Sequence, residues 1–181
     1  MSDLTVYIYD AKSELSEEER LYRSASHYSG LDPSVFSKVR TKGGKPFFPN
    51  APHIKFSISH SGDYWACAFG SSEVGLDIQE HKKCRYRDIS KRFFNPAEAE
   101  YLETRGYAPE EFFRIWAAKE SYVKFTGKGL SQGLAGFSVL SPIEGAELRH
   151  IPFREGYSMC LCAEKIGKVL LNTENLNPAD D

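Results

Sequence analysis

Cysteine is scarce in this sequence, and long apolar runs are absent. The four cysteines are Cys67, Cys84, Cys160 and Cys162, and no two of them form a C-x-x-C pair. Three lie inside apolar, strand-like segments, so we expect buried free thiols in a reducing compartment rather than a zinc site or a disulfide framework. No apolar stretch approaches the roughly 20 residues of a membrane-spanning helix, which argues against a membrane protein.

An excess of positive charge is also missing. Lys and Arg number 23 against 25 Asp and Glu, a net charge of −2, so overall charge gives no reason to expect a nucleic-acid-binding protein. Residues 1–4 contain neither the basic region nor the apolar core of a signal peptide, so a cytoplasmic location is expected. With 41% hydrophobic residues over 181 positions, the composition is typical of a globular protein of one domain or two small halves.

Hydrophobic patterning predicts strands and a helix in the first part of the chain. Residues 4–9 are rich in β-branched and aromatic side chains and are typical of a strand. Residues 16–28 form a predicted helix, with Ser16 as its N-cap and Glu19 three positions later. Residues 53–59 alternate apolar and polar, and Gly62-Asp63 leads into an apolar segment at 64–69, which together predict a β-hairpin.

The second part of the chain repeats this theme. We predict strands at 73–79, 137–140 and 157–163, a helix opened by Asn95 and Pro96, and a longer helix from 109 to 126 closed by Gly127. The apolar segments at 64–68 and 157–161 are similar in character. These patterns predict an α+β fold of two similar halves, 1–72 and 73–171, related by a pseudo-two-fold axis with the active site in the cleft between them. The polar tail, 172–181, is expected to be frayed.

A carboxylate interrupts the apolar strand predicted at 73–79. Its apolar residues share one face, whereas Asp77 and Gln79 share the other and lie about 7 Å apart. A carboxylate there is costly to bury unless it is paired, bound to a metal or facing a cleft. The strand alone leaves two interpretations open: a functional ligand, or an aspartate that pairs with a basic neighbour or caps a turn.

The long predicted helix carries charged residues beside its core-facing side. Its core face consists of Phe112, Ile115, Trp116 and Val123. Glu120 and Lys124 lie one turn apart at the edge of that face, whereas Lys119 falls within it, where a lysine must snorkel or meet an anion. Taken alone, this pattern favours an ordinary surface Glu–Lys pair with a snorkelling lysine beside it.

Together, the strand and the helix predict a magnesium site. Asp77 and Glu120 could hold one hard divalent cation, since Mg²⁺ accepts one or two carboxylates and completes its coordination with water and phosphate oxygens. Lys119 and Lys124 would then contact the phosphates. The combination suits phosphoryl-type transfer, in which positioning and charge neutralisation provide most of the catalysis.

Several ordered motifs resemble the 4′-phosphopantetheinyl transferase superfamily. They read G-L-D-I-Q at 75–79, W-A-A-K-E-S-Y-V-K at 116–124 and G-K-G-L at 127–130. Upstream, G-K-P at 44–46 and S-I-S-H-S-G at 57–62 are similar to motifs of the surfactin-synthetase-activator (Sfp) type, as is R-F-F at 92–94. The resemblance covers roughly residues 20 to 163, and the ordered set is far more specific than any single motif.

The resemblance implies an enzyme that transfers 4′-phosphopantetheine from coenzyme A to a serine of an acyl or peptidyl carrier protein and releases 3′,5′-ADP. It implies a monomer that uses Mg²⁺, or Mn²⁺ in its place. By position, Asp77, Gln79 and Glu120 match the metal ligands. Glu120 also matches the general base and Lys124 the residue that stabilises the leaving group. The implied coenzyme A contacts are Lys45, Ser59, His60, Asp77, Lys119 and Lys124.

Two departures from the family pattern carry predictions. Gln79 stands where this type often has Glu, which removes one negative charge and predicts weaker metal binding. The stretch before the first signature is shorter than usual, so some basic contacts to coenzyme A are expected to be missing. Arg20 and Arg23 could replace them, although exposed helix charges are the favoured interpretation. Without the flanking motifs, His60 would be an ordinary turn histidine and Lys45 a solvated turn lysine.

A basic segment follows the first signature. Residues 81–92 hold six Lys or Arg and one Asp. Such a run is usually a solvated face, but the resemblance places carrier docking here, and a basic surface would attract acidic carrier proteins. The docking residues implied are Lys82, Lys83, Arg85 and Arg87.

Two other functions stay open at this point. One is a catalytically weakened family member that binds carrier protein or coenzyme A without turnover, an alternative supported by Gln79 and the short N-terminal half. The other is a basic interaction module, for example for nucleic acid, which the missing nucleic-acid motifs and the negative net charge disfavour. The sequence does not distinguish carriers of fatty-acid, polyketide or nonribosomal peptide synthesis.

Overall fold

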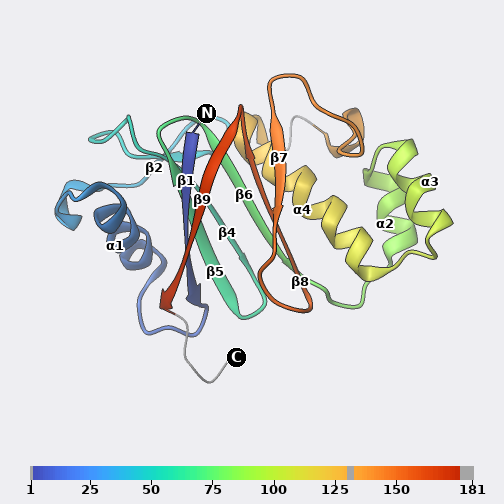
Figure 1. Ribbon diagram of the computed structural model, residues 1–181, viewed down its shortest axis with the longest axis horizontal. Coiled ribbons are helices and arrows are strands. Elements are labelled where there is room, and N and C mark those ends of the chain that lie inside the picture. The colour runs from blue at the N-terminus through green and yellow to red at the C-terminus, as the bar shows by residue number, and fades with distance from the viewer. Residues whose placement is uncertain (1, 130–132, 176–181) are drawn as a thin grey trace.

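Two β-sheets and a long helix organise the chain, whose computed structural model describes residues 2–129 and 133–175 (Figure 1). The helices are α1 (Glu17–Ser29), α2 (Tyr86–Phe93), α3 (Pro96–Thr104) and α4 (Pro109–Thr126), with short 3₁₀ turns at Pro33–Val35 and Leu134–Gly136. The strands are β1 (Ser2–Asp10), β2 (Val39–Arg40), β3 (Pro46–Phe47), β4 (Lys55–Ser61), β5 (Tyr64–Gly70), β6 (Val74–Glu80), β7 (Glu147–Ile151), β8 (Tyr157–Ala163) and β9 (Ile166–Asn175).

The sheets pack face to face and are covered by helices on their outer sides. One sheet has the order β4-β5-β1-β9, the other β6-β8-β7, and β2 pairs with β3 as a separate small ribbon. Apolar side chains of β1, β5, β6 and β8 form one buried cluster between the two sheets. Figure 1 shows α1 beside the first sheet and α4 beside the second, so the layers run helix, sheet, sheet, helix. The predicted α+β class is confirmed.

The division of the chain into two halves is less simple than the sequence suggests. Strand β9, which lies in the predicted C-terminal half, runs parallel to β1 and completes the N-terminal sheet. Each sheet also has its own strand number and order. The predicted boundary at residue 72 therefore does not separate the sheets, and the pseudo-two-fold relation stays a prediction.

Local signals placed several elements correctly. Helix α1 begins after Ser16 with the predicted capping box to Glu19, and α3 begins after Asn95 with Pro96 in its first turn. Helix α4 ends at Thr126 and is followed by Gly127 in the left-handed conformation, with φ of 67°. Strands β4 and β5 form the predicted hairpin. These elements were predictable because their signals lie within a few residues of their ends.

The prediction of a strand at 137–140 is wrong. This region follows the 3₁₀ turn Leu134–Gly136 and has an irregular backbone, because side chains rather than a neighbouring strand satisfy its peptide groups. Lys119 donates to the carbonyl of Phe137 at 2.7 Å, and the carboxylate of Glu98 accepts the amide of Val139 at 2.7 Å. Strands β7 and β9 and helix α2 were not predicted.

The predicted polar tail also needs adjustment. Strand β9 continues to Asn175, so the first residues of that segment belong to the sheet. Residues 176–181 and Leu130, the last residue of the predicted G-K-G-L motif, lie outside the described residues. All four cysteines are free, as expected, and three are buried. Within 2–129 and 133–175, none of the helices has both the length and the apolar character that crossing a bilayer requires.

Candidate active site

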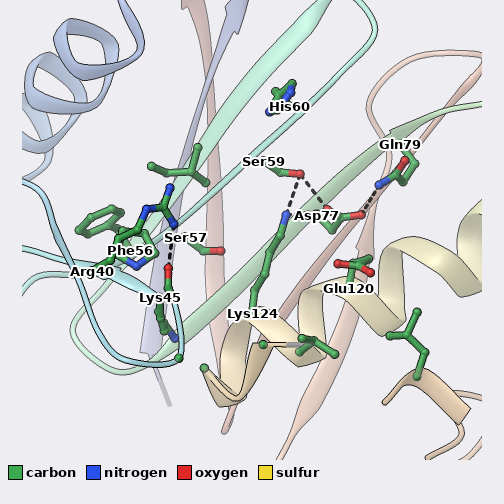
Figure 2. A pocket seen from close by; sticks show the side chains of 18 of the residues that line it. Arg40, Lys45, Phe56, Ser57, Ser59, His60, Asp77, Gln79, Glu120 and Lys124 are labelled. Atoms are coloured by element: carbon green, nitrogen blue, oxygen red, sulfur yellow. Dashed lines mark hydrogen bonds and ion pairs between the residues drawn. The ribbon is translucent and has the colours of Figure 1, made fainter. Parts of the chain in front are cut away.

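A cavity of about 890 Å³ opens where the two sheets and α4 meet. Strand β4 contributes Ser59 and His60, β6 contributes Asp77 and Gln79, and α4 contributes Trp116, Glu120 and Lys124. Figure 2 shows the side chains of Ser59, Asp77, Gln79, Glu120 and Lys124 converging from three elements that lie far apart in the sequence. The motifs singled out from the sequence therefore meet in one place.

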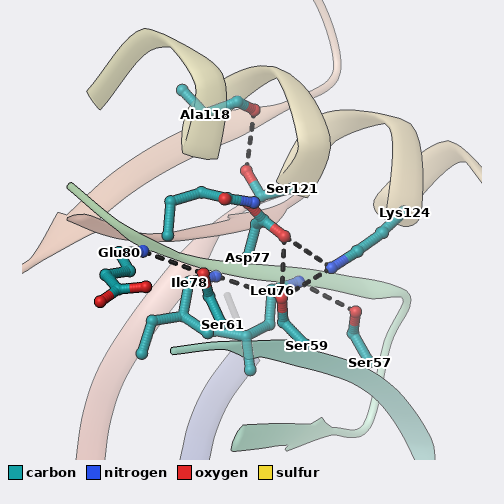
Figure 3. A network of polar contacts seen from close by, with 11 residues as sticks. Ser57, Ser59, Ser61, Leu76, Asp77, Ile78, Glu80, Ala118, Ser121 and Lys124 are labelled. Atoms are coloured by element: carbon teal, nitrogen blue, oxygen red, sulfur yellow. Dashed lines mark hydrogen bonds and ion pairs between the residues drawn. The ribbon is translucent and has the colours of Figure 1, made fainter. Parts of the chain in front are cut away.

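A ladder of serine hydroxyls joins β4 to β6 across the boundary between the sheets (Figure 3). The amides of Leu76, Ile78 and Glu80 donate to the hydroxyl oxygens of Ser57, Ser59 and Ser61 at 3.0, 3.2 and 3.0 Å, respectively. In each pair the amide lies 19 residues after the serine. A constant separation means that the two strands run in the same direction. The hydroxyls take the place of the carbonyls of a paired strand, which satisfies amides that would otherwise be buried without an acceptor. The ladder fixes the register of β6, and with it the position of Asp77.

Asp77 lies at the centre of a buried polar network. Its side chain accepts three hydrogen bonds: from Lys124 Nζ at 2.7 Å and Ser59 Oγ at 2.8 Å to Oδ1, and from Gln79 Nε2 at 2.9 Å to Oδ2. Only 2% of Asp77 is exposed. One of the three donors is charged, so the contact between Lys124 and Asp77 is a charge-assisted hydrogen bond. The pairing with a basic residue, one of the two interpretations of the strand, is thus present, and Asp77 also lines the cavity.

The hydrogen atom of Ser59 can be assigned. The Ser59 oxygen contacts the amide of Ile78 and, at 2.9 Å, the ammonium of Lys124, and both of these groups can only donate. The hydroxyl hydrogen must therefore be donated to Asp77. Ser59 links Lys124 to Asp77 as well as joining the two strands.

Glu120 faces the same cavity from α4. Burial raises the pKa of its carboxyl, and the negative charge of Asp77 raises it further, whereas Lys124 lowers it. Two carboxylates facing one cavity repel each other, so a divalent cation between them would be favourable. The donor set fits such a cation. Across 2–129 and 133–175, no group of three or more His, Cys, Asp and Glu side chains is arranged to hold a metal, so water and phosphate oxygens would complete the coordination.

Gln79 is placed differently from a metal ligand. Its amide nitrogen, not its oxygen, points to Asp77, as Figure 2 shows. In this arrangement Gln79 orients the Asp77 carboxylate. Direct ligation of a cation by Gln79 would require the amide to turn over so that its oxygen faced the metal.

The structure corrects the prediction that Lys119 contacts phosphate. Its side chain is fully buried, and Nζ donates to Glu98 Oε2 at 2.6 Å and to the carbonyl of Phe137 at 2.7 Å. The ammonium also lies 4.2 Å from the centre of the Phe137 ring. Burial lowers the pKa of Lys119, and the Glu98 carboxylate opposes this effect. Lys119 therefore does not reach the cavity, and the predicted contact with coenzyme A is replaced by a structural role beneath it.

Lys45 and Arg20 also differ from expectation. Lys45 is neither a solvated turn lysine nor a free cation, because its ammonium pairs with Glu73 and with backbone carbonyls. Arg20 is only 6% exposed and donates to the carbonyls of Ala11 and Ser13, so it is not an exposed helix charge. Arg23 is exposed on α1 and does not line the cavity, whereas the exposed His60 does.

The basic segment forms a surface beside the cavity. Its second half folds as α2, and the four predicted docking residues, Lys82, Lys83, Arg85 and Arg87, are all exposed. Phe93, the last residue of α2, is 44% exposed and lines the cavity. The C-terminal end of α2 therefore reaches the cavity, whereas the four predicted docking residues do not line it.

Arg40 is a cavity residue that the sequence did not single out. It lies on β2, a strand of two residues that is too short to give a periodic signal. The available hint was the alternation of Lys38 and Arg40 just before a double-glycine turn, because two cations on alternate positions of an extended segment share a face.

Comparison with known proteins agrees with this geometry. The model of the 4′-phosphopantetheinyl transferase superfamily matches residues 73–171. A 4′-phosphopantetheinyl transferase of Bacillus subtilis is 36% identical over 155 residues, which cover 83% of this chain and 67% of the relative. The Sfp protein of Bacillus subtilis strain 168 is 36% identical over 147 residues, 74% of this chain and 65% of that protein. The psf-1 protein of Bacillus pumilus is 32% identical over 174 residues, 88% of this chain and 74% of that protein.

Proposed function

Because this chain belongs to the 4′-phosphopantetheinyl transferase superfamily, we propose that it transfers the 4′-phosphopantetheinyl group of coenzyme A to a serine of an acyl or peptidyl carrier protein. The serine oxygen attacks the β-phosphorus, the bond from that phosphorus to the bridging oxygen breaks, and 3′,5′-ADP leaves. The observation that carries this proposal is the convergence of Asp77, Glu120 and Lys124 in one cavity.

Asp77 and Glu120 are the residues that would hold Mg²⁺, or Mn²⁺ in its place. Bound there, the cation would neutralise charge on the diphosphate and on the leaving group. Ser59 and Gln79 keep Asp77 oriented toward this position, since each donates a hydrogen bond to its carboxylate. Because Gln79 is uncharged, the site has two carboxylates rather than three. It is therefore expected to bind the cation less tightly than a site of three acids.

Glu120 is the base that would accept the proton of the carrier serine, directly or through a water molecule. A general base works best when its pKa lies near the working pH. Burial and the Asp77 charge raise the pKa of Glu120 above the ordinary range of a glutamate, which brings it closer to neutral pH. Glu120 is thus a better proton acceptor than an exposed carboxylate would be.

Lys124 would stabilise the leaving 3′,5′-ADP. Its ammonium is anchored on Asp77 and Ser59 and leaves 29% of the side chain exposed to the cavity. An ammonium has three hydrogens, and the two bonds to these partners leave one for a phosphate oxygen. Lys124 can therefore keep its contact with Asp77 while it donates to the substrate.

The exposed cations before and within α2 would guide an acidic carrier protein to the cavity. Reversing the charge of Lys82 and Lys83 together should slow carrier modification and weaken its dependence on salt. The matched control is charge reversal of Lys165, in the β8–β9 turn, and Lys168, near the start of β9. Both are exposed and neither lines the cavity. Equal effects of the two double variants would contradict the docking role.

The activity is tested by incubating the protein with apo-carrier proteins of fatty-acid, polyketide and peptide synthesis, coenzyme A and Mg²⁺, and then measuring the mass of each carrier. We expect a gain of one phosphopantetheine group on at least one carrier, and no gain with Glu120→Ala. No gain on any carrier, with coenzyme A binding intact, would favour the alternative of a family member that binds without turnover.

A further inference from the structure

Gly75, the first residue of the G-L-D-I-Q motif, lies where β6 and α4 are in direct backbone contact. A Cβ atom added to Gly75 would overlap the carbonyl oxygen of Ser121 and would lie 2.6 Å from the amide nitrogen of Phe125. These two groups are four residues apart, the separation of a helical hydrogen bond. A glycine inside a strand often marks a place where another backbone comes close. Gly75 therefore packs directly on the backbone of α4, which a side chain at this position would hold away.

The face of α4 that meets the second sheet carries small side chains at this level. Ala117, Ala118 and Ser121 are each at most 2% exposed. Ala117 and Ala118 form a buried cluster with Cys160 of β8, and α4 packs on both β6 and β8. Small residues on the helix and a glycine on the strand let the two backbones lie closer together than larger side chains would allow.

This close contact places the charged side chains of α4 beside Asp77. Strand alternation puts Gly75 and Asp77, two residues apart, on the same face of β6. Lys124 Nζ lies 2.7 Å from Asp77 Oδ1 and 2.9 Å from Ser59 Oγ. Figure 2 shows Glu120, one turn before Lys124, next to Asp77. The spacing between α4 and β6 thus sets how far the carboxylates of Asp77 and Glu120 lie from each other.

Moving α4 away from β6 would affect its two charged side chains differently. Ordinary contact of a Cβ begins at 3.4 Å, so α4 and β6 would have to separate to admit one at Gly75. Lys124 has a long, flexible stem and can extend to keep its contact with Asp77. Glu120 is shorter, and Mg²⁺ requires near-octahedral geometry with oxygens at about 2.0–2.1 Å. Cation binding between Asp77 and Glu120 would therefore be the property most sensitive to this separation.

We propose that Gly75 is a positioning residue: by admitting the backbone of α4, it sets the spacing at which Asp77 and Glu120 can share one divalent cation. The inference rests on the proposed function, because it takes this pair of carboxylates as the cation site. It adds a reason why the strand carries a glycine two residues before Asp77. Gly75 acts through the two carboxylates, since it has no side chain that could contact substrate or cation.

The experiment compares Gly75→Ala with the matched control Gly70→Ala in the full chain. Gly70 is also a buried strand glycine, but a Cβ there would first meet the side chain of Leu4, which can move aside, rather than a helix backbone. Electron paramagnetic resonance measures Mn²⁺ binding with and without coenzyme A. Initial rates of carrier modification give kcat and KM, and thermal unfolding is followed in parallel.

Gly75→Ala should weaken Mn²⁺ binding and lower kcat by about 10- to 100-fold each, the usual effect of disturbing the groups that orient metal ligands. The KM for coenzyme A should stay nearly unchanged, because Lys124 keeps its contact with Asp77. Gly70→Ala should leave Mn²⁺ binding and kcat as in the wild type. If Gly75→Ala does not fold, Ala118→Val thickens the same face of α4 and should weaken Mn²⁺ binding, with Ala25→Val, buried between α1 and the first sheet, as its control.

The proposal is overturned if folded Gly75→Ala, or Ala118→Val in its place, binds Mn²⁺ as tightly as the wild type, even if its unfolding temperature falls. It is also overturned if the control variant weakens Mn²⁺ binding equally, or if the wild type does not bind Mn²⁺. If the wild type modifies the carrier and Gly75→Ala does so equally well, the proposed function stands and this inference fails. If the wild type modifies no carrier but Gly75→Ala still weakens Mn²⁺ binding, the proposed function fails and this inference stands.

Discussion

The buried pair of Lys119 and Glu98 provides the sharpest prediction about stability. Both side chains are fully buried, and their charged atoms are 2.6 Å apart. Glu98 also accepts the amides of Asn95 and Val139, at 3.0 and 2.7 Å. The pair therefore connects α3, α4 and the irregular segment after residue 133. We expect either single substitution, Lys119→Met or Glu98→Ala, to destabilise the fold.

The two substitutions should differ in size. Removing one partner of a buried ion pair costs about 3–5 kcal/mol of unfolding free energy. Lys119→Met should lie at the lower end, because Glu98 keeps two amide donors. Glu98→Ala should lie at or above the upper end, since it leaves the Lys119 ammonium with one carbonyl and two amides without an acceptor. The double variant Glu98→Leu with Lys119→Met should be less destabilised than Glu98→Ala, because no charge stays buried.

Urea unfolding of the three variants at neutral pH measures these differences, and calorimetry with coenzyme A shows whether the folded fraction still binds. The reasoning predicts a loss of stability with nearly unchanged coenzyme A affinity. It would be refuted if Lys119→Met kept wild-type stability but lost coenzyme A binding. That result would return Lys119 to the phosphate-contact role that its motif position first indicated.

Three further predictions concern the cavity. Gln79→Glu should tighten Mg²⁺ binding measured by calorimetry, because it adds a carboxylate next to Asp77; unchanged affinity would argue against a position near the metal. Replacing Ser57 and Ser61 together by Ala should weaken Mg²⁺ binding, because Asp77 would shift. The control is Ser24→Ala, which removes a buried hydroxyl bonded to Tyr9 on the far side of the first sheet and should reduce stability without affecting Mg²⁺ binding. Similar effects of the two variants on Mg²⁺ binding would contradict the positioning role of Ser57 and Ser61. The raised pKa of Glu120 means that its ionised form destabilises the fold, so Glu120→Gln should be more stable than wild type at pH 7. That gain should disappear as the pH falls below the ordinary glutamate range, and a gain that persists in acid would need another cause.

Much of the site was predictable because its signals are local or ordered along the chain. Asp77 stood out as a carboxylate in an apolar strand, and Glu120 and Lys124 stood out at the edge of a helix face. The structure places all three in one cavity. The caps of α1 and α4 followed from residues adjacent to the helix ends.

The errors share a physical cause, which is partners distant in sequence. The sequence around Lys119 does not indicate that Glu98 is its partner, because the pair forms only when α3 packs against α4. The same pair determines the backbone after Phe137, which is why the predicted strand there fails. Lys45 likewise meets the end of α4, 80 residues away in the sequence. Periodicity shows which face of a helix or strand is buried, but not which polar group of another element will contact that face.

The central claim is that the cluster of Asp77, Glu120 and Lys124 transfers phosphopantetheine, with Glu120 as the base. The most direct test is the initial rate of holo-carrier formation, followed by intact carrier mass, for wild type and Glu120→Gln at saturating coenzyme A and Mg²⁺. Folding and coenzyme A binding of the variant are verified first. We predict that the wild type converts the carrier and that Glu120→Gln is slower by about 100-fold or more, the typical contribution of a positioned general base. A folded Glu120→Gln variant that converts the carrier within a few-fold of the wild-type rate would contradict the account.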